Sequence, residues 1–300
     1  MIHSTHVLRC PTLAPVNSTS RDPVLGKLVD AQRYPIDQPE SSTYRTIVAD
    51  ARRQLAADGC LVLPEFIAPA GQTMFETETE LVAPGAWHRQ SMVNPYNTAD
   101  DPSLPADDPR RIFHPHRAGF VAADYFADDG PTKQLWRSSD FHRFLAAIVG
   151  LGEVHTYDDP LAGVVVNVMR DGTDLEWHYD ANEFVVSLLT KQPEVGGAFE
   201  YCPNIRQPGH EHYEQVGAVL RGDRSLVKSV DLRRGDLQVF FGRYSLHRVA
   251  ELGGERHTVI FGYAREPGTI GQAARARMLF GRTHPRHHEP APDHEGLLTG

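Results

Sequence analysis

The pattern of apolar and polar positions changes character about halfway along the chain. In the first half, apolar residues recur at helical spacing, and Phe141, Phe144, Leu145 and Ile148 follow an i, i+3, i+4, i+7 pattern. Serines that can cap a helix begin the first such segment, and Gly59 is placed to end it. The predicted helices span residues 41–58, 69–82 and 132–149, the last as two pieces that meet near residue 139.

From about residue 161 the pattern becomes strand-like. β-branched runs such as Val164-Val165-Val166 alternate with turn signals such as Asp171-Gly172. Short strands are predicted at residues 60–63, 164–169, 175–180, 184–189, 198–201, 226–230, 237–241 and 259–263. Many short strands with turn signals at this spacing indicate a β-sandwich or barrel. The predicted fold class is therefore α+β, with helices mostly N-terminal to the β core.

We expect three parts along the chain. Residues 1–40 read as an irregular N-terminal arm, residues 41–270 as a single domain, and residues 271–300 as a C-terminal extension that is partly mobile. Within the domain, residues 83–111 are dense in Pro, Asp and Asn. A loop of this length is typical of a lid or a binding loop.

Composition narrows the classes of partner. Of 300 residues, 40% are apolar and 23% charged, which is ordinary for a globular protein, and the net charge of −9 disfavours nucleic acid and anionic membranes. No run approaches a membrane span and no signal-peptide core is seen. The cysteines, Cys10, Cys60 and Cys202, are too few and scattered for a disulfide framework. A cytoplasmic location is expected.

One short motif suggests metal chemistry. His178 and Asp180 are two apart, so on an extended strand their side chains share one face. His247 is a second histidine far downstream. Two histidines and one carboxylate form the facial triad of non-heme Fe(II) oxygenases. Arg256 follows nine residues later (256 − 247 = 9) at the start of an apolar run, where its guanidinium could hold a carboxylate through two hydrogen bonds.

The ordered set of His-x-Asp, distant His and Arg resembles the Fe(II)/2-oxoglutarate-dependent oxygenases. That resemblance covers roughly residues 161–267 and implies a double-stranded β-helix of the jelly-roll or cupin-like kind. It also implies Fe(II) bound by His178, Asp180 and His247, with 2-oxoglutarate and O₂ as cosubstrates. Arg256 would then pair with the far carboxylate of 2-oxoglutarate.

The local sequence around the two histidines resembles that of the branch containing the free-amino-acid halogenases and their hydroxylase relatives. In the halogenases of that branch a small residue replaces the carboxylate and leaves a coordination position for halide, whereas this chain has Asp180. The resemblance therefore implies hydroxylation of an unactivated C–H bond in a small polar metabolite, such as a free amino acid or a derivative.

Further pocket residues are candidates only. Asn167 and Thr258 could contact the cosubstrate, although Asn167 could equally be a polar residue at a barrel edge. Arg117 could hold a substrate carboxylate or form a surface ion pair. Three more residues near the metal motif could contact the substrate, namely Asn182, Glu183 and Arg243.

Other histidine pairs are not expected to bind metal. His114, His116, His210 and His212 lie in polar, turn-like segments with no nearby carboxylate on a strand.

Several functions remain open at this stage. The same iron centre could catalyse desaturation or cyclisation, or the chain could be a non-catalytic jelly-roll binding protein. A zinc hydrolase on a cupin-like barrel is a further alternative, but it gives Arg256 no role. The substrate, its stereochemistry and the oligomeric state are not indicated by the sequence.

Overall fold

The computed structural model describes residues 25–289, which form two antiparallel sheets with helices around them. The strands of the larger sheet are β1 (Cys60–Leu63), β2 (Trp87–His88), β5 (Gly119–Val121), β7 (Val164–Met169), β9 (Val185–Lys191), β13 (Leu237–Phe240) and β15 (Arg256–Phe261). Those of the smaller sheet are β8 (Thr173–His178), β10 (Val195–Gly196), β11 (Phe199–Cys202), β12 (Lys228–Val230) and β14 (Leu246–Gly253). Two separate pairs are β3 (Ser91–Val93) with β4 (His114–His116), and β6 (His155–Thr156) with β16 (Tyr263–Ala264).

The larger sheet has the strand order β1-β13-β9-β15-β7-β5-β2, and the smaller has β10-β14-β11-β12 with β8 paired to β14. Every pairing is antiparallel, so strands distant in sequence become neighbours, as in a jelly roll. This agrees with the predicted α+β class.

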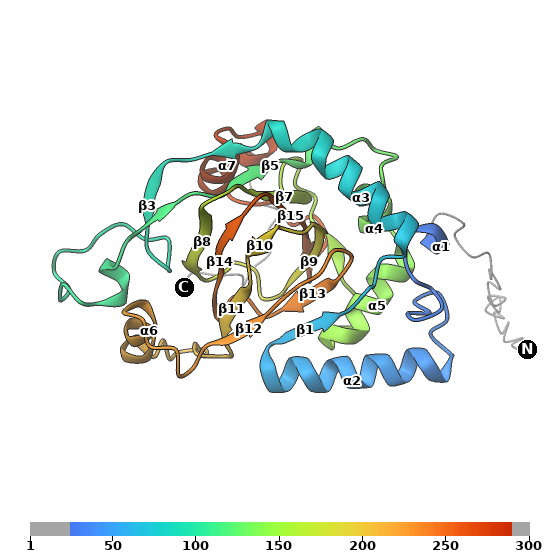
Figure 1. The fold of residues 1–300 in the computed structure, drawn as a ribbon, viewed down its shortest axis with the longest axis horizontal. Helices are drawn as coiled ribbons and strands as arrows, with labels where there is room; N and C mark the ends of the chain where they lie inside the picture. The colour runs from blue at the N-terminus through green and yellow to red at the C-terminus, as the bar shows by residue number, and fades with distance from the viewer. Residues whose placement is uncertain (1–24, 290–300) are drawn as a thin grey trace, which may run out of the picture.

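Helices cover the outer side of the larger sheet (Figure 1). They are α1 (Leu25–Leu28), α2 (Ser42–Asp58), α3 (Pro69–Val82), α4 (Pro131–Trp136) and α5 (Ser139–Val149), while α6 (Tyr213–Leu220) and α7 (Ala273–Phe280) come later in the chain. The 3₁₀ turns are η1 (Ala83–Gly85), η2 (Pro109–Arg111), η3 (Ala123–Tyr125) and η4 (Pro285–His288).

The predicted helices are confirmed, and their ends have local causes. The Ser41 hydroxyl accepts a hydrogen bond from the Tyr44 N–H and caps α2, and Gly59 ends that helix at a φ of 64°. Ser138 caps α5 in the same way, which divides the segment into the two expected pieces. Helices α1, α6 and α7 are not among the predicted ones. All three are short, and neither α6 nor α7 has a side-chain N-cap.

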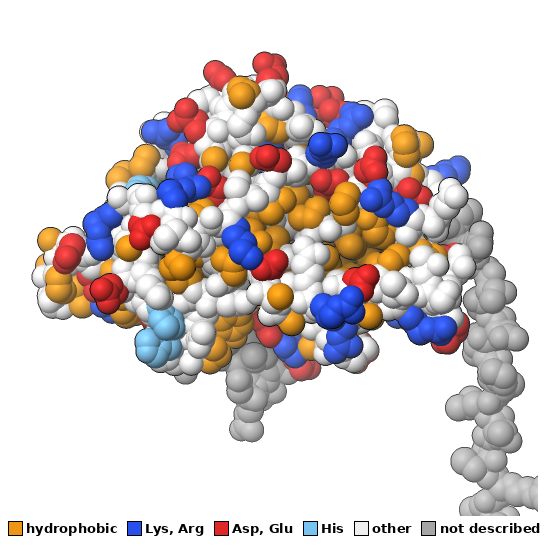
Figure 2. Space-filling model, turned by 60° about the horizontal axis from the view of Figure 1, so that its bottom comes forward, with side chains coloured by type: hydrophobic (Ala, Val, Ile, Leu, Met, Phe, Trp, Pro, Cys, Tyr) orange, Lys and Arg blue, Asp and Glu red, His pale blue; other side chains and the backbone are white. Residues whose placement is uncertain are grey.

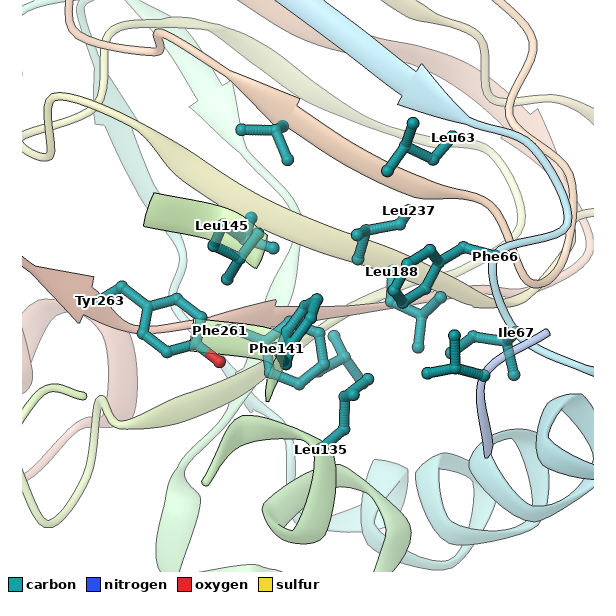
Figure 3. Packing of buried hydrophobic residues seen from close by; sticks show 14 of the residues in the cluster. Leu63, Phe66, Ile67, Leu135, Phe141, Leu145, Leu188, Leu237, Phe261 and Tyr263 are labelled. Atoms are coloured by element: carbon teal, nitrogen blue, oxygen red, sulfur yellow. The ribbon is translucent and has the colours of Figure 1, made fainter. Parts of the chain in front are cut away.

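The main hydrophobic core lies between the helices and the larger sheet. Figure 3 shows Leu188, Leu237 and Phe261 of the sheet meeting Leu135 and Phe141 of the helices. The rings of Phe141 and Phe261 are 5.9 Å apart in an edge-on arrangement. Burying an apolar side chain of this size contributes about 1.5–3 kcal/mol, so this layer fixes the helices on the sheet.

The strand predictions hold except at two places that matter for the site. β8 ends at His178 and does not continue to Asp180. β14 was not predicted at all, because two register shifts against β8 break the alternation of inward and outward residues that marks a strand. His247 is the second residue of this strand and is buried.

The C-terminal segment is anchored by a deeply buried carboxylate. Asp159, 4% exposed, accepts hydrogen bonds from the N–H groups of Leu161, Ala162 and Gly271. The fourth bond comes from His287 Nε2 at 3.0 Å, and that imidazole is fully buried. These bonds tie η4 to the loop before β7.

The outer face of the described chain is mixed in charge. On the face shown in Figure 2, basic and acidic side chains are interspersed around an apolar area near the centre. Nucleic-acid binding calls for an extended basic surface, which this face does not offer. No helix within residues 25–289 is both long enough and apolar enough to span a membrane.

A buried imidazole on the helix side of β15 gives the fold a pH dependence. His257 is fully buried, and burial lowers the pKa of this side chain below 6.5, against the opposing charge of Glu255. Because the folded state prefers the neutral ring, its contribution to stability is complete above pH 6.5 and is lost as the pH falls toward the lowered pKa.

We therefore expect a lower melting temperature at about pH 5.5 than at about pH 7.5, and a smaller difference in His257→Leu. Thermal melts of both proteins at both pH values measure this. Comparing differences within each protein removes the general effect of the substitution on packing. An unchanged difference in the variant would show that His257 contributes nothing to the acid sensitivity.

Candidate active site

The predicted metal residues meet between the two sheets. His178, the last residue of β8, pairs in register with His247 near the start of β14, and their ring centres are 4.2 Å apart. Asp180 Oδ1 lies 3.9 Å from His178 Nε2, and Asp180 Oδ2 lies 3.2 Å from His247 Nε2. One ligand atom from each residue can be chosen so that all lie within 4.8 Å of one another, close enough to hold one ion.

Backbone carbonyls orient both imidazoles in the same way. His178 Nδ1 lies 2.7 Å from the carbonyl oxygen of Glu176, and His247 Nδ1 lies 2.8 Å from that of Ser245. In each case Nδ1–H donates to a carbonyl two residues earlier. The Nε2 lone pairs are therefore free to face Asp180, as a metal ligand requires.

The protonation states also suit a metal. Burial, followed by the charge of His247, lowers the pKa of His178 to about 4. Burial alone would raise the pKa of Asp180, but the two imidazoles beside it, His247 more than His178, lower it to about 2. At neutral pH the site therefore presents a neutral His178 and an ionised carboxylate, the forms that bind metal.

Asp180 reaches the site in a different way from the one predicted. It lies two residues beyond the end of β8, and its N–H donates to the carbonyl of Gly242 at 3.1 Å. Gly242 has to lack a side chain, because a Cβ there would overlap Asp180 Oδ2. The convergence of His178 and Asp180 is thus set by a turn from another part of the chain and not by strand alternation.

Arg256 is a buried cation without a counter-charge. Its residue is 3% exposed, and Nη1 donates to Thr258 Oγ1 at 2.6 Å. Burial lowers the pKa of this guanidinium to about 10, and among residues 25–289 no carboxylate pairs with it. Asn167, 2% exposed, lies opposite Thr258 in the sheet, and its Oδ1 has no partner in the described structure.

These groups fit the cosubstrate that the sequence implies. A buried guanidinium that lacks a carboxylate is costly unless a ligand supplies one. The donor set of two imidazoles and one carboxylate suits Fe(II), and the three side chains leave further coordination positions for a chelating 2-oxo acid and O₂.

Two of the four substrate candidates lie beside the metal residues. Arg243 donates through Nε to the carbonyl of Ala181 at 3.2 Å, next to Asp180 in sequence. Asn182 Oδ1 accepts a hydrogen bond of 2.6 Å from the Tyr157 hydroxyl. Tyr157 is a neighbour of this loop that the sequence did not single out.

The other two candidates are in ion pairs. Glu183 forms a two-point pair with Arg265 at 2.6 and 2.7 Å. Arg117 has a side chain that is 45% exposed, and it lies 3.9 Å from Asp174. Its position matches the surface ion pair that the sequence left open as the alternative.

One expectation about the other histidines is wrong. His116 does face a carboxylate on a strand, since its Nδ1 lies 2.7 Å from Glu176 Oε1 on β8. The pair is almost fully buried, with the side chains 10% and 7% exposed. Sequence reasoning missed it because 60 residues separate the two (176 − 116 = 60), and no local pattern connects them.

Fold and site together define the class. Two facing antiparallel sheets with a His-Asp-His set between them are those of the Fe(II)/2-oxoglutarate-dependent oxygenases, with a double-stranded β-helix core. Within that class, the chain belongs to the halogenase D family, whose sequence model, described as Halogenase D, matches residues 44–278.

Solved structures agree on the fold. AviO1 from Streptomyces viridochromogenes Tue57 is 18% identical, with a TM-score of 0.50 over 74% of this chain and 96% of that one. The non-heme alpha ketoglutarate dependent epimerase SnoN from nogalamycin biosynthesis is 12% identical, with a TM-score of 0.50 over 73% of this chain and 83% of that one. Among curated proteins, none matches the chain.

Proposed function

We propose that this protein is a hydroxylase-type oxygenase of the halogenase D family. Its substrate would be a small polar metabolite, with free amino acids and their derivatives the first class to test. The observation that carries the proposal is the carboxylate of Asp180, whose Oδ2 lies 3.2 Å from His247 Nε2. A carboxylate in this place occupies the coordination position that a halide would need.

In this proposal His178, Asp180 and His247 hold Fe(II) on one face. Bound Fe(II) with 2-oxoglutarate supplies the activation of O₂, coupled to decarboxylation of the cosubstrate. The carbonyls of Glu176 and Ser245 keep each Nε2 aimed at the metal. His247 is buried, whereas the side chains of His178 and Asp180 are 18% and 16% exposed.

Arg256 and Thr258 would receive the far carboxylate of 2-oxoglutarate. The hydrogen bond from Nη1 to Thr258 Oγ1 holds the guanidinium in one direction, and the remaining N–H groups are available to a carboxylate. Asn167 lies opposite Thr258 in the sheet; its Nδ2 donates to the Gly119 carbonyl at 3.4 Å, and its second N–H would complete the polar end of the pocket.

The test is a turnover screen with Fe(II), ascorbate and 2-oxoglutarate across free amino acids and related amines. We expect at least one compound to stimulate succinate formation and to gain one oxygen atom by mass spectrometry. Loss of two hydrogens in place of oxygen gain would identify the desaturation or cyclisation alternative. His247→Ala is the control, and stimulation that persists in it would not come from this site.

Arg256 is expected to set the requirement for 2-oxoglutarate. Removing one partner of a buried, hydrogen-bonded charge pair costs about 2–5 kcal/mol, so Arg256→Leu should raise the half-saturating 2-oxoglutarate concentration by about 100-fold. Arg256→Lys keeps the charge but loses the two-point geometry of the guanidinium. Its half-saturating 2-oxoglutarate concentration should lie between those of the parent and Arg256→Leu. The measurement is initial rate against 2-oxoglutarate concentration.

Arg117→Leu is a matched control, since it removes a guanidinium that is partly exposed and paired with Asp174. We expect its 2-oxoglutarate requirement to equal that of the parent. If Arg256→Leu also behaves like the parent, Arg256 does not bind the cosubstrate.

A further inference from the structure

The carboxylate ligand lies where the sheet no longer fixes the backbone. Beyond His178, the Tyr179 N–H donates to the carbonyl of Pro95 at 3.0 Å, and the Asp180 N–H donates to the carbonyl of Gly242. The backbone N–H groups of Tyr179 and Asp180 are therefore both bonded to carbonyls from other segments of the chain. The Pro95 carbonyl belongs to the long loop between β3 and β4.

Asn94 gives the start of that loop a single shape. Its side chain is fully buried, and Nδ2 donates to the Thr98 carbonyl at 3.0 Å, to Thr98 Oγ1 at 3.0 Å and to the Arg110 carbonyl at 2.6 Å. Its Oδ1 accepts from the N–H groups of Tyr96 at 3.0 Å and Thr98 at 3.1 Å. These five bonds fix the turn that contains Pro95 and tie it to the far end of the loop.

Side chains hold the same contact in place. The centre of the Tyr179 ring lies 5.3 Å from that of Tyr96. The guanidinium of Arg206 lies 5.2 Å from the centre of the same Tyr179 ring. Tyr179 is 5% exposed, so its ring cannot turn without moving these neighbours. The loop therefore contacts Tyr179, which lies between the ligands His178 and Asp180 in the sequence.

The outer end of the loop is held as well. Arg110 lies over the ring of Tyr213, 4.3 Å from its centre, and Arg221 Nη1 donates to the carbonyl of Asp107 at 3.4 Å. Figure 1 shows this loop swinging out beyond β3 and returning close to α6, which carries Tyr213. The loop is thus anchored on α6 at one side and on Tyr179 at the other.

We propose that Asn94 is a positioning residue for Asp180. It shapes the turn of residues 94–98, the Pro95 carbonyl of that turn holds the Tyr179 peptide, and this peptide sets the direction of the carboxylate. The inference rests on the proposed role of Asp180 as a metal ligand. It adds that the loop predicted as a lid or binding loop is part of the metal centre.

The test uses Co(II) in place of Fe(II), because the visible absorption of bound Co(II) changes with its ligands and needs no turnover. Asn94→Ala removes all five bonds. We expect Co(II) affinity to fall about 10-fold, within the range seen for groups that orient metal ligands, and the absorption band to change shape. Asn97→Gly is the control, since Asn97 is exposed in the same loop at a φ of 53° and should leave both unchanged.

Two further variants make the result decisive. Asn94→Asp keeps the acceptor and loses the three bonds donated by Nδ2, so it reports on the loop if Asn94→Ala does not fold. Gly242→Ala crowds Asp180 directly and should change the Co(II) band without touching the loop.

A changed band in Gly242→Ala with parental spectra in both Asn94 variants would overturn the positioning role and leave Asp180 as a ligand. A parental band in Asp180→Ala would instead remove Asp180 from the metal site and with it the proposed function.

Discussion

Asp180→Gly is expected to abolish most hydroxylation and to produce little or no chlorinated product. The substitution removes the third protein ligand and its negative charge, which weakens the hold on the metal, and it opens the position that a halide would need. Productive halogenation also requires the substrate to be placed correctly at the metal, which one substitution does not provide. We therefore expect hydroxylation to be lost without an equivalent gain of chlorination.

Product mass spectrometry on parent and variant with chloride present measures this outcome. Asp180→Asn serves as a matched variant, because it keeps the shape of the side chain and loses the charge. Chlorinated product from the parent would overturn the assignment, since Asp180 would then not hold the halide position.

His178→Ala or His247→Ala is expected to abolish stoichiometric iron binding while the fold remains. Loss of an outer-shell partner already reduces metal affinity by about 10–100-fold, and loss of a ligand should exceed that. Iron titration with thermal melting of the metal-free proteins separates binding from folding. His210→Ala removes an exposed histidine and should bind iron like the parent. If His178→Ala and His247→Ala both bind iron with the affinity of the parent, the assignment of the three metal ligands is wrong.

Helices and several strands could be predicted because their causes are local. The serine caps of α2 and α5 and the glycine at residue 59 act within a few residues of their helices. The β-branched run of β7 is buried along its whole length, so burial and sequence agree at every position. Such features need no knowledge of the rest of the chain.

The convergence of His178 and His247 could also be predicted, but from residue types in a characteristic order and not from the geometry of the strands. The strand of His247 itself was missed, because its bulges hide the alternation. Asp180 was expected on a strand, yet a turn at Gly242 places it. The set of residue types was therefore a better guide than the local conformation assumed for them.

The other contacts between distant segments could not be predicted. Nothing near His116 indicates Glu176, and nothing in the loop of Asn94 indicates Tyr179. The one local signal was the Asn94-Pro95 pair, which is typical of a turn. It indicates the shape of the loop but not the segment against which the loop packs.

The buried carboxylate of Asp159 has a consequence for where this protein can be cut. The match to the family ends at residue 278, yet His287 lies beyond it, with its imidazole fully buried and bonded to that carboxylate. On the other side the match starts at residue 44, and Leu28 is fully buried before it. A chain trimmed to the matched segment would leave an under-bonded internal charge and an open apolar surface. Boundaries for expression should therefore follow burial and extend past the region of sequence similarity at both ends.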